Sequence, residues 1–297
     1  MDDSLFQRIK IFEQKSSGKQ KRLAQYFLSQ FDEIPFRTVA EISNKAGVSD
    51  ATVIRFSRTL GYEGFPQLRE QFQRTILEKL SPSERFHRVI VFPDNFAELV
   101  SLVFETEVHN LRETEKGLEI DNILKIAECI IKAGRKYIVG LRASSGCAYL
   151  LGRFLTQILP NVITILDGDS RLFEGLRNIG KEDILVAISY PRYTKVTLEA
   201  VQFAIDRNAT TVTITDSALS PSAQLSKYAL IALSNSCNFA NSYIGCLSLI
   251  NLLVTLIIHM DKDHAEINLR EWEKTIENFH FHYRNGIPSI QAIRRTT

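Results

Sequence analysis

The sequence predicts two domains of different class: a small all-α domain, then an α/β domain with a five-stranded parallel sheet and helices on both faces. The chain has 297 residues, which is more than one typical domain needs. Up to about residue 80 the apolar residues keep helical spacing, as in Leu23, Phe27 and Phe31. Beyond residue 135, strand-like runs alternate with helical segments, which is typical of parallel strands joined by crossover helices.

Composition changes and turn residues divide the chain into four parts. Glycines and prolines break the first part into short helices, and Ser81-Pro82 and Pro93 mark a linker. The expected parts are a helical domain (1–80), a linker with a connecting helix (81–119), the α/β domain (120–262) and a C-terminal helix with a loose tail (263–297). The expected strands are "KYIVGL" (136–141), "VITIL" (162–166), "DILVAIS" (183–189), "TTVTITD" (210–216) and "YALIAL" (228–233). Further helical patterns cover 95–116, 120–133 and 265–284.

The charge balance restricts the kind of partner. The formal net charge is only +2, which excludes a protein that coats a polyanion with its whole surface. Residues 1–80 contain 13 Lys and Arg against 10 Asp and Glu, so the positive excess lies in the helical part. Any nucleic-acid binding is therefore expected to be local and N-terminal.

The cysteines and the apolar content indicate a reduced, cytoplasmic protein. Cys129, Cys147, Cys237 and Cys246 show no metal-ligand spacing, and "MDDSLFQRIK" does not read as a secretory leader, so we expect no metal site. The stretch 237–260 carries no charge over a length that could cross a bilayer. Several Asn and Ser residues dilute it, and it follows a strand-like run, so we expect a buried helix of an α/β layer and no membrane span.

The stretch "TVAEISNKAGVSDATVIRF" (38–56) has the spacing of a helix-turn-helix. Gly47 supplies the turn, and Ser49 can cap the second helix. Apolar or small residues occupy the positions that must face inward: Ile42, Ala46, Val48, Val53 and Phe56.

With Val53 and Phe56 turned inward, the second helix presents a polar face to the outside. Recognition helices offer such a face to the major groove of DNA, where arginine can bind guanine or phosphate. The candidate DNA-binding residues are Ser49, Asp50, Ala51, Thr52, Arg55 and Arg58. The alternative is a packed helix pair whose arginines are merely solvated. The separate small domain and its basic surplus favour a double-stranded DNA operator as the partner.

The run "ATVIRFSRTLGYEGF" (51–65) resembles the "ATVxRFxxxLGYxGF" mark of the RpiR/MurR class of bacterial transcription regulators. The continuation "GYEGFPQLRE" into a further helix is peculiar to that class. The resemblance covers about residues 1–80 and implies a DNA-binding helix-turn-helix domain.

Two loops of the α/β domain each follow a strand and open a helix with hydroxyl residues. They are "GLRASSGCA" (140–148) and "SYPRYTK" (189–195). Helix N-termini offer unpaired N–H groups, so Ser144, Ser145, Ser189 and Thr194 are candidates for an anion cradle, with a phosphate as the anion. The alternative is that these hydroxyls are ordinary helix caps.

The same region, about 120–260, resembles the SIS (sugar isomerase) fold, which binds phosphosugars in isomerases, amidotransferases and RpiR/MurR regulators. Its first loop pattern, GxGxSxxxA, is met by Gly140, Ser144 and Ala148, while Arg142 replaces the second glycine. In the second pattern, SxSGxT, Ser189 and Thr194 fit, and Pro191, Arg192 and Tyr193 depart from it. Arg192 can add a salt bridge to a phosphate or carboxylate. Tyr193 is placed to fill space that a sugar would otherwise occupy.

No catalytic set emerges from the sequence. A phosphosugar isomerase needs a base beside the phosphate site, typically Glu or His. Glu174 and Glu199 lie within helical patterns and read as solvated or ion-paired. His259 and His264 flank the apolar helix, and His280 and His282, two positions apart, read as surface residues. An isomerase or another SIS-type enzyme therefore remains the alternative function, and no cofactor is indicated.

These observations predict a DNA-binding transcriptional regulator whose operator affinity depends on a small phosphorylated metabolite, a phosphosugar by the resemblance. One recognition helix reads one half-site, so a homodimer or higher homo-oligomer is expected. The apolar helix 243–260 and the helix pair 95–133 are the candidate interface elements.

Overall fold

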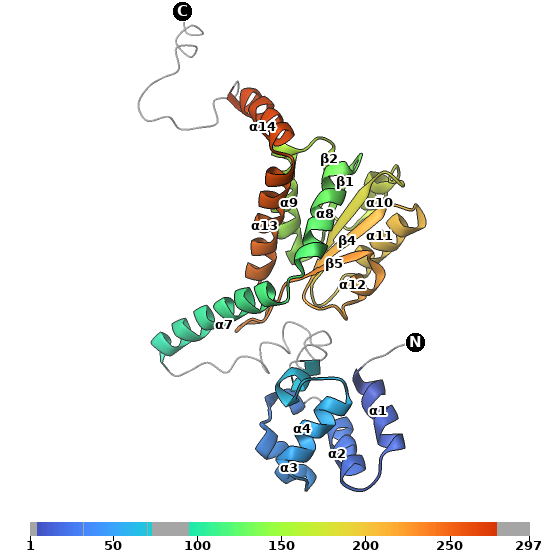
Figure 1. Ribbon diagram of the computed structural model, residues 1–297, viewed down its shortest axis with the longest axis vertical. Helices are drawn as coiled ribbons and strands as arrows, with labels where there is room; N and C mark the ends of the chain where they lie inside the picture. The colour runs from blue at the N-terminus through green and yellow to red at the C-terminus, as the bar shows by residue number, and fades with distance from the viewer. Residues whose placement is uncertain (1–4, 32, 70, 73–94, 278–297) are drawn as a thin grey trace, which may run out of the picture. The chain divides into compact units, whose positions relative to one another are not determined.

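A computed structural model describes residues 5–31, 33–69, 71–72 and 95–277. The chain forms two compact units that divide between residues 91 and 92 (Figure 1). Each unit has its own hydrophobic core. The stretch 81–94, expected as a linker, lies outside the described residues, as do 278–284 of the expected last helix.

The first unit is all-helical, as predicted. Its helices are α1 (Leu5–Lys15), α2 (Gly18–Ser29), α3 (Val39–Ala46) and α4 (Asp50–Thr59), with a 3-10 turn at Ile34–Phe36. Aromatic rings fill the centre: Phe27 lies 4.8 Å from Phe56 and 5.5 Å from Phe72, between ring centroids. This cluster fixes α4 against α2, because Phe27 and Phe56 are both fully buried.

The second unit is built on a five-stranded, all-parallel sheet in the order β2-β1-β3-β4-β5. The strands are β1 (Lys136–Gly140), β2 (Val162–Ile165), β3 (Ile184–Ile188), β4 (Thr210–Thr215) and β5 (Tyr228–Ile231). All five predicted strands are confirmed to within two residues. The chain order reverses between β1 and β3, and ligands bind at such switch points in open α/β sheets.

Helices cover both faces of the sheet, as predicted (Figure 1). They are α7 (Phe96–Lys116), α8 (Ile120–Lys132), α9 (Ser145–Ile158), α10 (Ser170–Leu176), α11 (Lys195–Asp206), α12 (Pro221–Leu225), α13 (Ile244–Met260) and α14 (Lys262–Glu277). Alternate strand residues serve the two cores: Ile138 and Val186 pack with α8, α9 and α13, while Val139 and Leu185 pack with α10 and α11.

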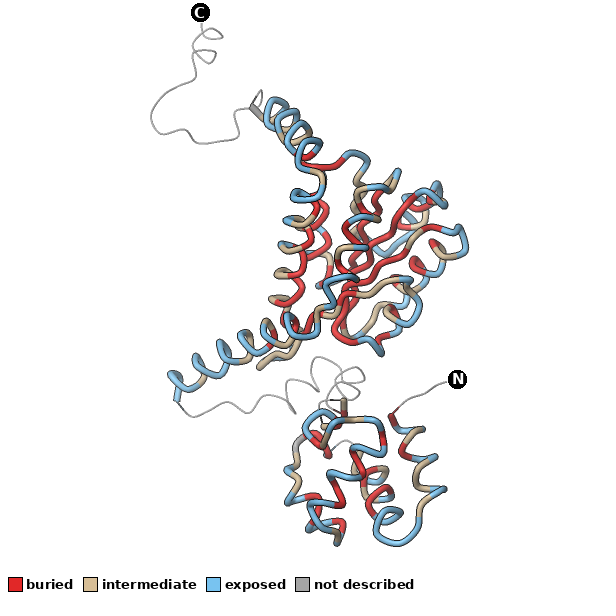
Figure 2. The backbone as a smooth tube through the Cα atoms, viewed as in Figure 1, coloured by how far each residue is buried: buried red, intermediate tan, exposed pale blue. Residues whose placement is uncertain are grey.

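The uncharged stretch 237–260 becomes a loop followed by α13, which buries one side in the core, as Figure 2 shows. Among the described residues, a bilayer-crossing length of apolar helix is not reached by any single helix. Only α13 and α14 taken together meet that criterion, and they are bent by 109° at their junction.

Candidate functional site

The turn between α3 and α4 has the geometry that the sequence predicts. Thr38 and Glu41 form a capping box at the start of α3. Gly47 ends α3 with φ +64°, a left-handed conformation that glycine adopts without strain. Because α3 ends before Gly47, α4 begins after a turn of three residues and packs against α3.

The inward face of the pair is confirmed. Ile42, Val53 and Phe56 are 0% exposed, and Ala46 is buried beside them. Val48 is half-buried and packs against the same core. The opposite face of α4 is therefore the one that meets solvent, and it carries Asp50, Ala51, Ile54, Arg55 and Arg58, all exposed.

Two expectations for α4 need correction. Thr52 is only 5% exposed, and its hydroxyl lies 2.9 Å from that of Ser49, so its side chain is withdrawn from the outer face. Ser49 occupies the N-cap position, but its side chain makes no capping hydrogen bond because it pairs with Thr52 instead. The backbone oxygen of Ser49 still accepts from the Thr52 N–H at 2.8 Å.

The charged residues of α4 differ in whether they already form hydrogen bonds within the protein. The Ser43 hydroxyl donates to the Asp50 carboxylate, which ties α3 to α4. Arg58 Nε donates to the Glu63 carbonyl oxygen at 3.2 Å. The Arg55 guanidinium makes no hydrogen bond or ion pair with the part of the chain that the structure describes. Arg55 is therefore the side chain on this face with the most freedom to reach a partner.

Ile54 is a further exposed residue of this face that the sequence analysis did not include among the outward positions. It is 37% exposed and lies on the same face as Ala51 and Arg58. An apolar side chain there can contact the methyl group of thymine. A helical wheel drawn from Val53 and Phe56 would have placed it outward.

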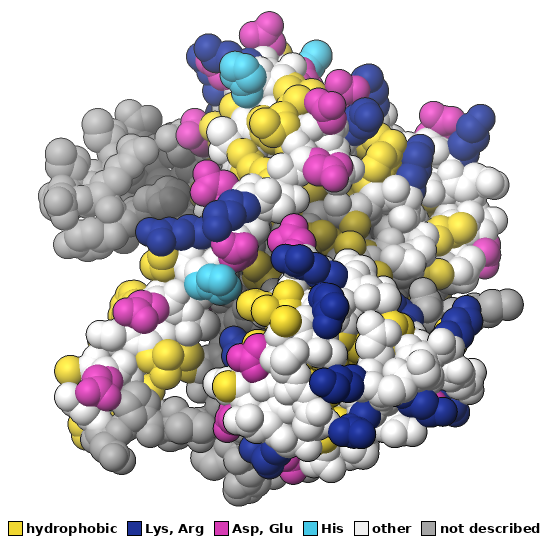
Figure 3. Space-filling model, turned by 60° about the horizontal axis from the view of Figure 1, so that its bottom comes forward, with side chains coloured by type: hydrophobic (Ala, Val, Ile, Leu, Met, Phe, Trp, Pro, Cys, Tyr) yellow, Lys and Arg dark blue, Asp and Glu magenta, His cyan; other side chains and the backbone are white. Residues whose placement is uncertain are grey.

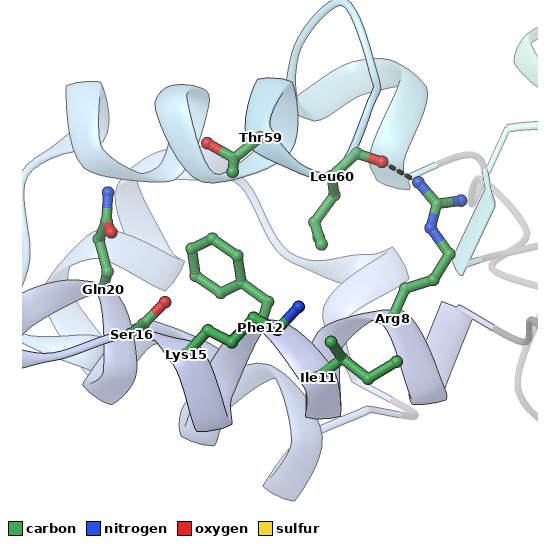
Figure 4. Close-up of a pocket in the computed structure, with 8 residues that line it drawn as sticks. All are labelled: Arg8, Ile11, Phe12, Lys15, Ser16, Gln20, Thr59 and Leu60. Carbon is green, nitrogen blue, oxygen red and sulfur yellow. Dashed lines mark hydrogen bonds between the residues drawn. The ribbon is translucent and has the colours of Figure 1, made fainter.

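The end of α4 is held by α1. Figure 4 shows Arg8 extending from α1 to the carbonyl oxygen of Leu60, to which its guanidinium donates a hydrogen bond. Arg8 also donates to the Tyr62 hydroxyl at 3.2 Å and lies over the Tyr62 ring. A cation at a helix C-terminus is favourable for the helix dipole. We assign a structural role to the hollow lined by Arg8, Ile11, Phe12 and Leu60, because Arg8 there joins α1 to the end of α4.

Basic side chains are spread over the helical unit. Figure 3 shows dark blue Lys and Arg side chains across the face of this unit that is turned forward. Exposed cations of this kind meet the phosphate backbone without regard to sequence. The helical unit thus carries both a candidate base-reading face on α4 and exposed basic side chains elsewhere on its surface.

The second candidate site lies at the switch point of the sheet. The two hydroxyl loops follow β1 and β3, whose last residues Gly140 and Ile188 are paired neighbours. A Cβ on Gly140 would lie 2.6 Å from the Ala148 Cβ and 2.7 Å from the Ser144 carbonyl oxygen. Glycine at 140 therefore lets the start of α9 approach the end of β1 closely.

Arg142 explains one departure from the SIS loop pattern. It stands where the pattern has its second glycine, and its φ is +57°. The loop therefore keeps the left-handed turn that the glycine would serve, although a non-glycine residue adopts it at a cost of about 1 kcal/mol. Its side chain is exposed.

The hydroxyls at this site are not used as caps. Asn95, Asp169 and Ser220 each cap their helix through the side chain, whereas Ser144 and Thr194, at the starts of α9 and α11, make no side-chain cap. The alternative of ordinary caps therefore does not describe Ser144 and Thr194. Ser189 is 3% exposed, and its Oγ has no hydrogen-bond partner within the described residues. A buried unpaired hydroxyl at a switch point invites a ligand acceptor.

The other loop residues are placed as follows. The Ser145 hydroxyl donates to the Arg142 carbonyl oxygen at 2.6 Å, so it supports the loop. The expectation that Ser145 belongs to the anion cradle therefore needs correction. Arg192 is exposed and Thr194 half-exposed. The Tyr193 hydroxyl donates to the Asp216 carboxylate at 2.9 Å, which fastens the second loop to the end of β4.

Two residues beyond the predicted set adjoin these loops. The Asn241 amide donates to the Pro191 carbonyl oxygen. Burial raises the pKa of the Tyr243 phenol, and hydrogen bonds with the Ser144 and Asn241 side chains lower it in part. Both residues precede α13 and are far from the loops in sequence, so no local pattern could have found them.

The described residues among those considered for catalysis are exposed, and some of them form ion pairs. Glu199 forms an ion pair with Lys195 at 3.2 Å, and Glu174 is exposed. His259 is exposed, His264 contacts Asp261, and His280 and His282 lie outside the described residues. Within the described ranges, no three His, Cys, Asp or Glu side chains are grouped to hold a metal ion.

Comparisons with known proteins match both units. A family model described as a helix-turn-helix domain of the rpiR family matches residues 4–79, and one for the SIS domain matches residues 129–256. An uncharacterized HTH-type transcriptional regulator of Clostridium perfringens is 25% identical over 82% of this chain and 88% of its own. The HTH-type transcriptional regulator RpiR of Escherichia coli is 22% identical over 81% of each chain.

Solved structures agree. The sugar isomerase domain of an RpiR transcription factor from Sphaerobacter thermophilus is 28% identical with a TM-score of 0.58, and the match covers 60% of this chain and 99% of that one. The Vibrio vulnificus NanR protein, solved with ManNAc-6P, shares the fold at 21% identity and a TM-score of 0.58, over 94% of this chain and 100% of that one. The chain belongs to the RpiR family of HTH-type transcriptional regulators, with an N-terminal helix-turn-helix domain and a C-terminal SIS domain.

Proposed function

We propose that this regulator binds an operator through the outer face of α4 and that a phosphosugar in the SIS domain changes its operator affinity. On α4, Arg55 and Arg58 are the candidates for guanine or phosphate contacts, and Ala51 and Ile54 for thymine methyl groups. Asp50 and Ser49 contribute by positioning the start of the helix, since their side chains are bonded to Ser43 and Thr52.

The observation that carries the effector site is the group of hydroxyls at the switch point that do not cap their helices, among them the unpaired hydroxyl of Ser189. Ser144 and Thr194 make no side-chain cap, and buried Ser189 has no partner within the described residues. The N–H groups that open α9 and α11 add positive dipole ends. Together these groups suit a phosphate. Arg192, exposed on the second loop, adds a cation at the rim.

The sugar-phosphate class is supported by a relative. NanR of V. vulnificus, which shares this fold, was solved in complex with ManNAc-6P. Tyr193 is held at the end of β4 by its hydrogen bond to Asp216, and we expect its ring to limit the size of the sugar moiety. The names of the relatives, which are transcriptional regulators, support the proposal that the ligand is an effector that is bound and released unchanged.

A homodimer is the proposed binding form, because one α4 reads only half of a two-fold operator. The candidate interface is the outer part of α7, where Phe96, Val100 and Phe104 are 84%, 57% and 68% exposed. The other end of α7 packs on α13, and the outer part of the helix projects beyond the α/β body (Figures 1 and 2). A second copy of the chain is the occupant that would complete the operator-binding form.

The test uses the full chain. A DNA fragment is selected from a random-sequence library, and its affinity is measured by fluorescence anisotropy with and without each member of a sugar-phosphate panel. A member that raises the melting temperature should also change the DNA affinity and be recovered chemically intact by NMR after long incubation. Turnover at ordinary enzymatic rates would instead support the isomerase alternative. No thermal shift with any member would overturn the effector site.

A further inference from the structure

The contact between α7 and the α/β body is unusual in being polar. The buried residues of this helix are Asn110 and Thr114, at 0% and 4% exposed. The Asn110 amide donates to the Asn235 carbonyl oxygen at 2.8 Å, and the Thr114 hydroxyl accepts from the Leu233 N–H at 3.1 Å. Both bonds lead to the segment that joins β5 to α13.

Two further contacts between α7 and the same segment lie nearer the start of α7. Thr106 Oγ1 lies 3.1 Å from Cys237 Sγ, and the Ser242 hydroxyl donates to the Glu107 carboxylate. From residue 106 to 114 the helix advances about two turns. Residues 233–243, named here the coupling segment, therefore follow α7 for that distance.

The other end of the coupling segment touches both effector loops. The Asn241 amide donates to the carbonyl oxygen of Pro191, two residues after Ser189. The Tyr243 ring lies 5.2 Å from that of Tyr190, between ring centroids. Burial raises the pKa of Tyr243, and the interaction of its phenol with the Ser144 side chain lowers that pKa in part. One short segment thus connects the cradle to α7, the first described helix of the second unit.

A polar seam responds to small displacements in a way that an apolar seam does not. Hydrogen bonds depend on direction and distance, so a shift of the Asn235 carbonyl breaks its bond, whereas apolar contacts tolerate sliding. The Asn110 Oδ1 atom has no hydrogen-bond partner among the described residues, although it is buried. A half-paired buried amide has a second pairing open to it when its surroundings move.

We infer that the coupling segment transmits occupancy of the effector site to α7, with Asn241 as the positioning residue at the effector end and Asn110 at the α7 end. The inference rests on the proposed function, because it takes the cradle as the effector site. A ligand held between the two loops moves the Pro191 carbonyl or the Tyr243 hydroxyl, and the segment carries that movement to Asn110. Of the described helices of the second unit, α7 is the one nearest in sequence to the helical unit, so a change in α7 is the one expected to reach the DNA-binding helices.

The variants are Asn110→Ala, Asn241→Ala and their combination in the full chain. The matched control is Asn122→Ala, which removes an equivalent bond of 2.8 Å from Asn122 on α8 to the Ala229 carbonyl oxygen of β5. The probe is the sugar phosphate that gives the largest thermal shift in the panel. The measured quantity is the ratio of affinities for the selected DNA fragment with and without this probe, which is typically about 5- to 150-fold in coupled systems.

Both single variants should bring this ratio to within about twofold of one, and the combined variant should lose no more than either single one. Binding of the probe to the Asn110→Ala protein alone should persist, while its dependence on DNA disappears, because coupling is reciprocal. Asn122→Ala should keep the wild-type ratio. A wild-type ratio in both Asn110→Ala and Asn241→Ala, with the probe bound, would overturn the coupling segment alone. If no sugar phosphate binds the wild-type protein, the effector site and this inference fall together.

Discussion

Replacing Ser189 with alanine should move stability and effector affinity in opposite directions. The Ser189 hydroxyl is buried and has no partner in the described part of the protein, so Ser189→Ala removes no native hydrogen bond. It removes instead the cost of burying an unpaired polar group, which is about 1 to 3 kcal/mol. The free energy of unfolding without effector should therefore stay constant or rise.

The bound state should respond differently. A hydrogen bond to a charged phosphate contributes about 1.5 to 3 kcal/mol, so its loss should raise the Kd of the effector roughly 10- to 150-fold. With Ser144→Ala added, the loss should reach two or more orders of magnitude, while DNA affinity without effector stays near that of wild type. Melting curves with and without a sugar phosphate, together with isothermal titration calorimetry, measure both quantities.

Ser220→Ala is the matched control. Ser220 is as buried as Ser189, but its Oγ accepts from the Ala223 N–H at 3.1 Å and caps α12. This control should lose about 0.5 to 2 kcal/mol of stability and bind effector normally. A Ser189→Ala protein that melts lower without ligand, or binds the effector with unchanged Kd, would show that the hydroxyl has a structural partner and no ligand.

Four further outcomes follow from the geometry. Arg55→Ala should weaken binding to the selected operator by about 1 to 3 kcal/mol, with less effect on random DNA, and equal operator affinity in gel shifts would remove it from the interface. Phe104→Asp should turn a dimer into a monomer in light scattering; an unchanged mass would place the interface elsewhere. Arg142→Gly relieves a left-handed residue at +57° and should leave the melting temperature equal or higher, whereas a clear fall would contradict the strain argument. The hydrogen bond with Asp261 raises the pKa of His264, so this pair stabilises α14 below about pH 6.5 and loses its effect as pH rises through the raised pKa; an NMR titration in which Asp261→Asn leaves the His264 pKa unchanged would refute the pairing.

The parts of this molecule that local patterns determine could be predicted from sequence. The five strands follow from apolar runs, because parallel strands buried on both faces need them. The left-handed turn follows from the glycine at position 47, and the inward residues of α4 follow from the spacing of its apolar residues. These features depend on residues within a few positions of one another.

The incorrect predictions concern side chains that could form hydrogen bonds with more than one nearby partner. Thr52 sits at the border of the outer face of α4, and its pairing with Ser49 takes it inward. Ser145 has the residue type of a cradle but donates to the carbonyl of Arg142 in its own loop. The polar contact between α7 and the coupling segment could not be predicted from the sequence, since Asn110 and Asn235 are 125 positions apart. Residue type indicates what a group can bond, and the fold decides with what.

The departures from an ideal sequence gather at the edge of the sheet where the effector is proposed to bind. Ser189 is buried without a partner, Arg142 holds a left-handed backbone, and Ser144 and Thr194 forgo the caps that their residue types favour. Each lowers the stability of the ligand-free form and would be removed by selection for stability alone. A ligand that supplies the missing partners binds one state of the loops better than others, and only such a difference in affinity can shift an equilibrium. In the proposed function, these groups would supply both the selectivity of the effector site and the means by which its occupancy acts on α7.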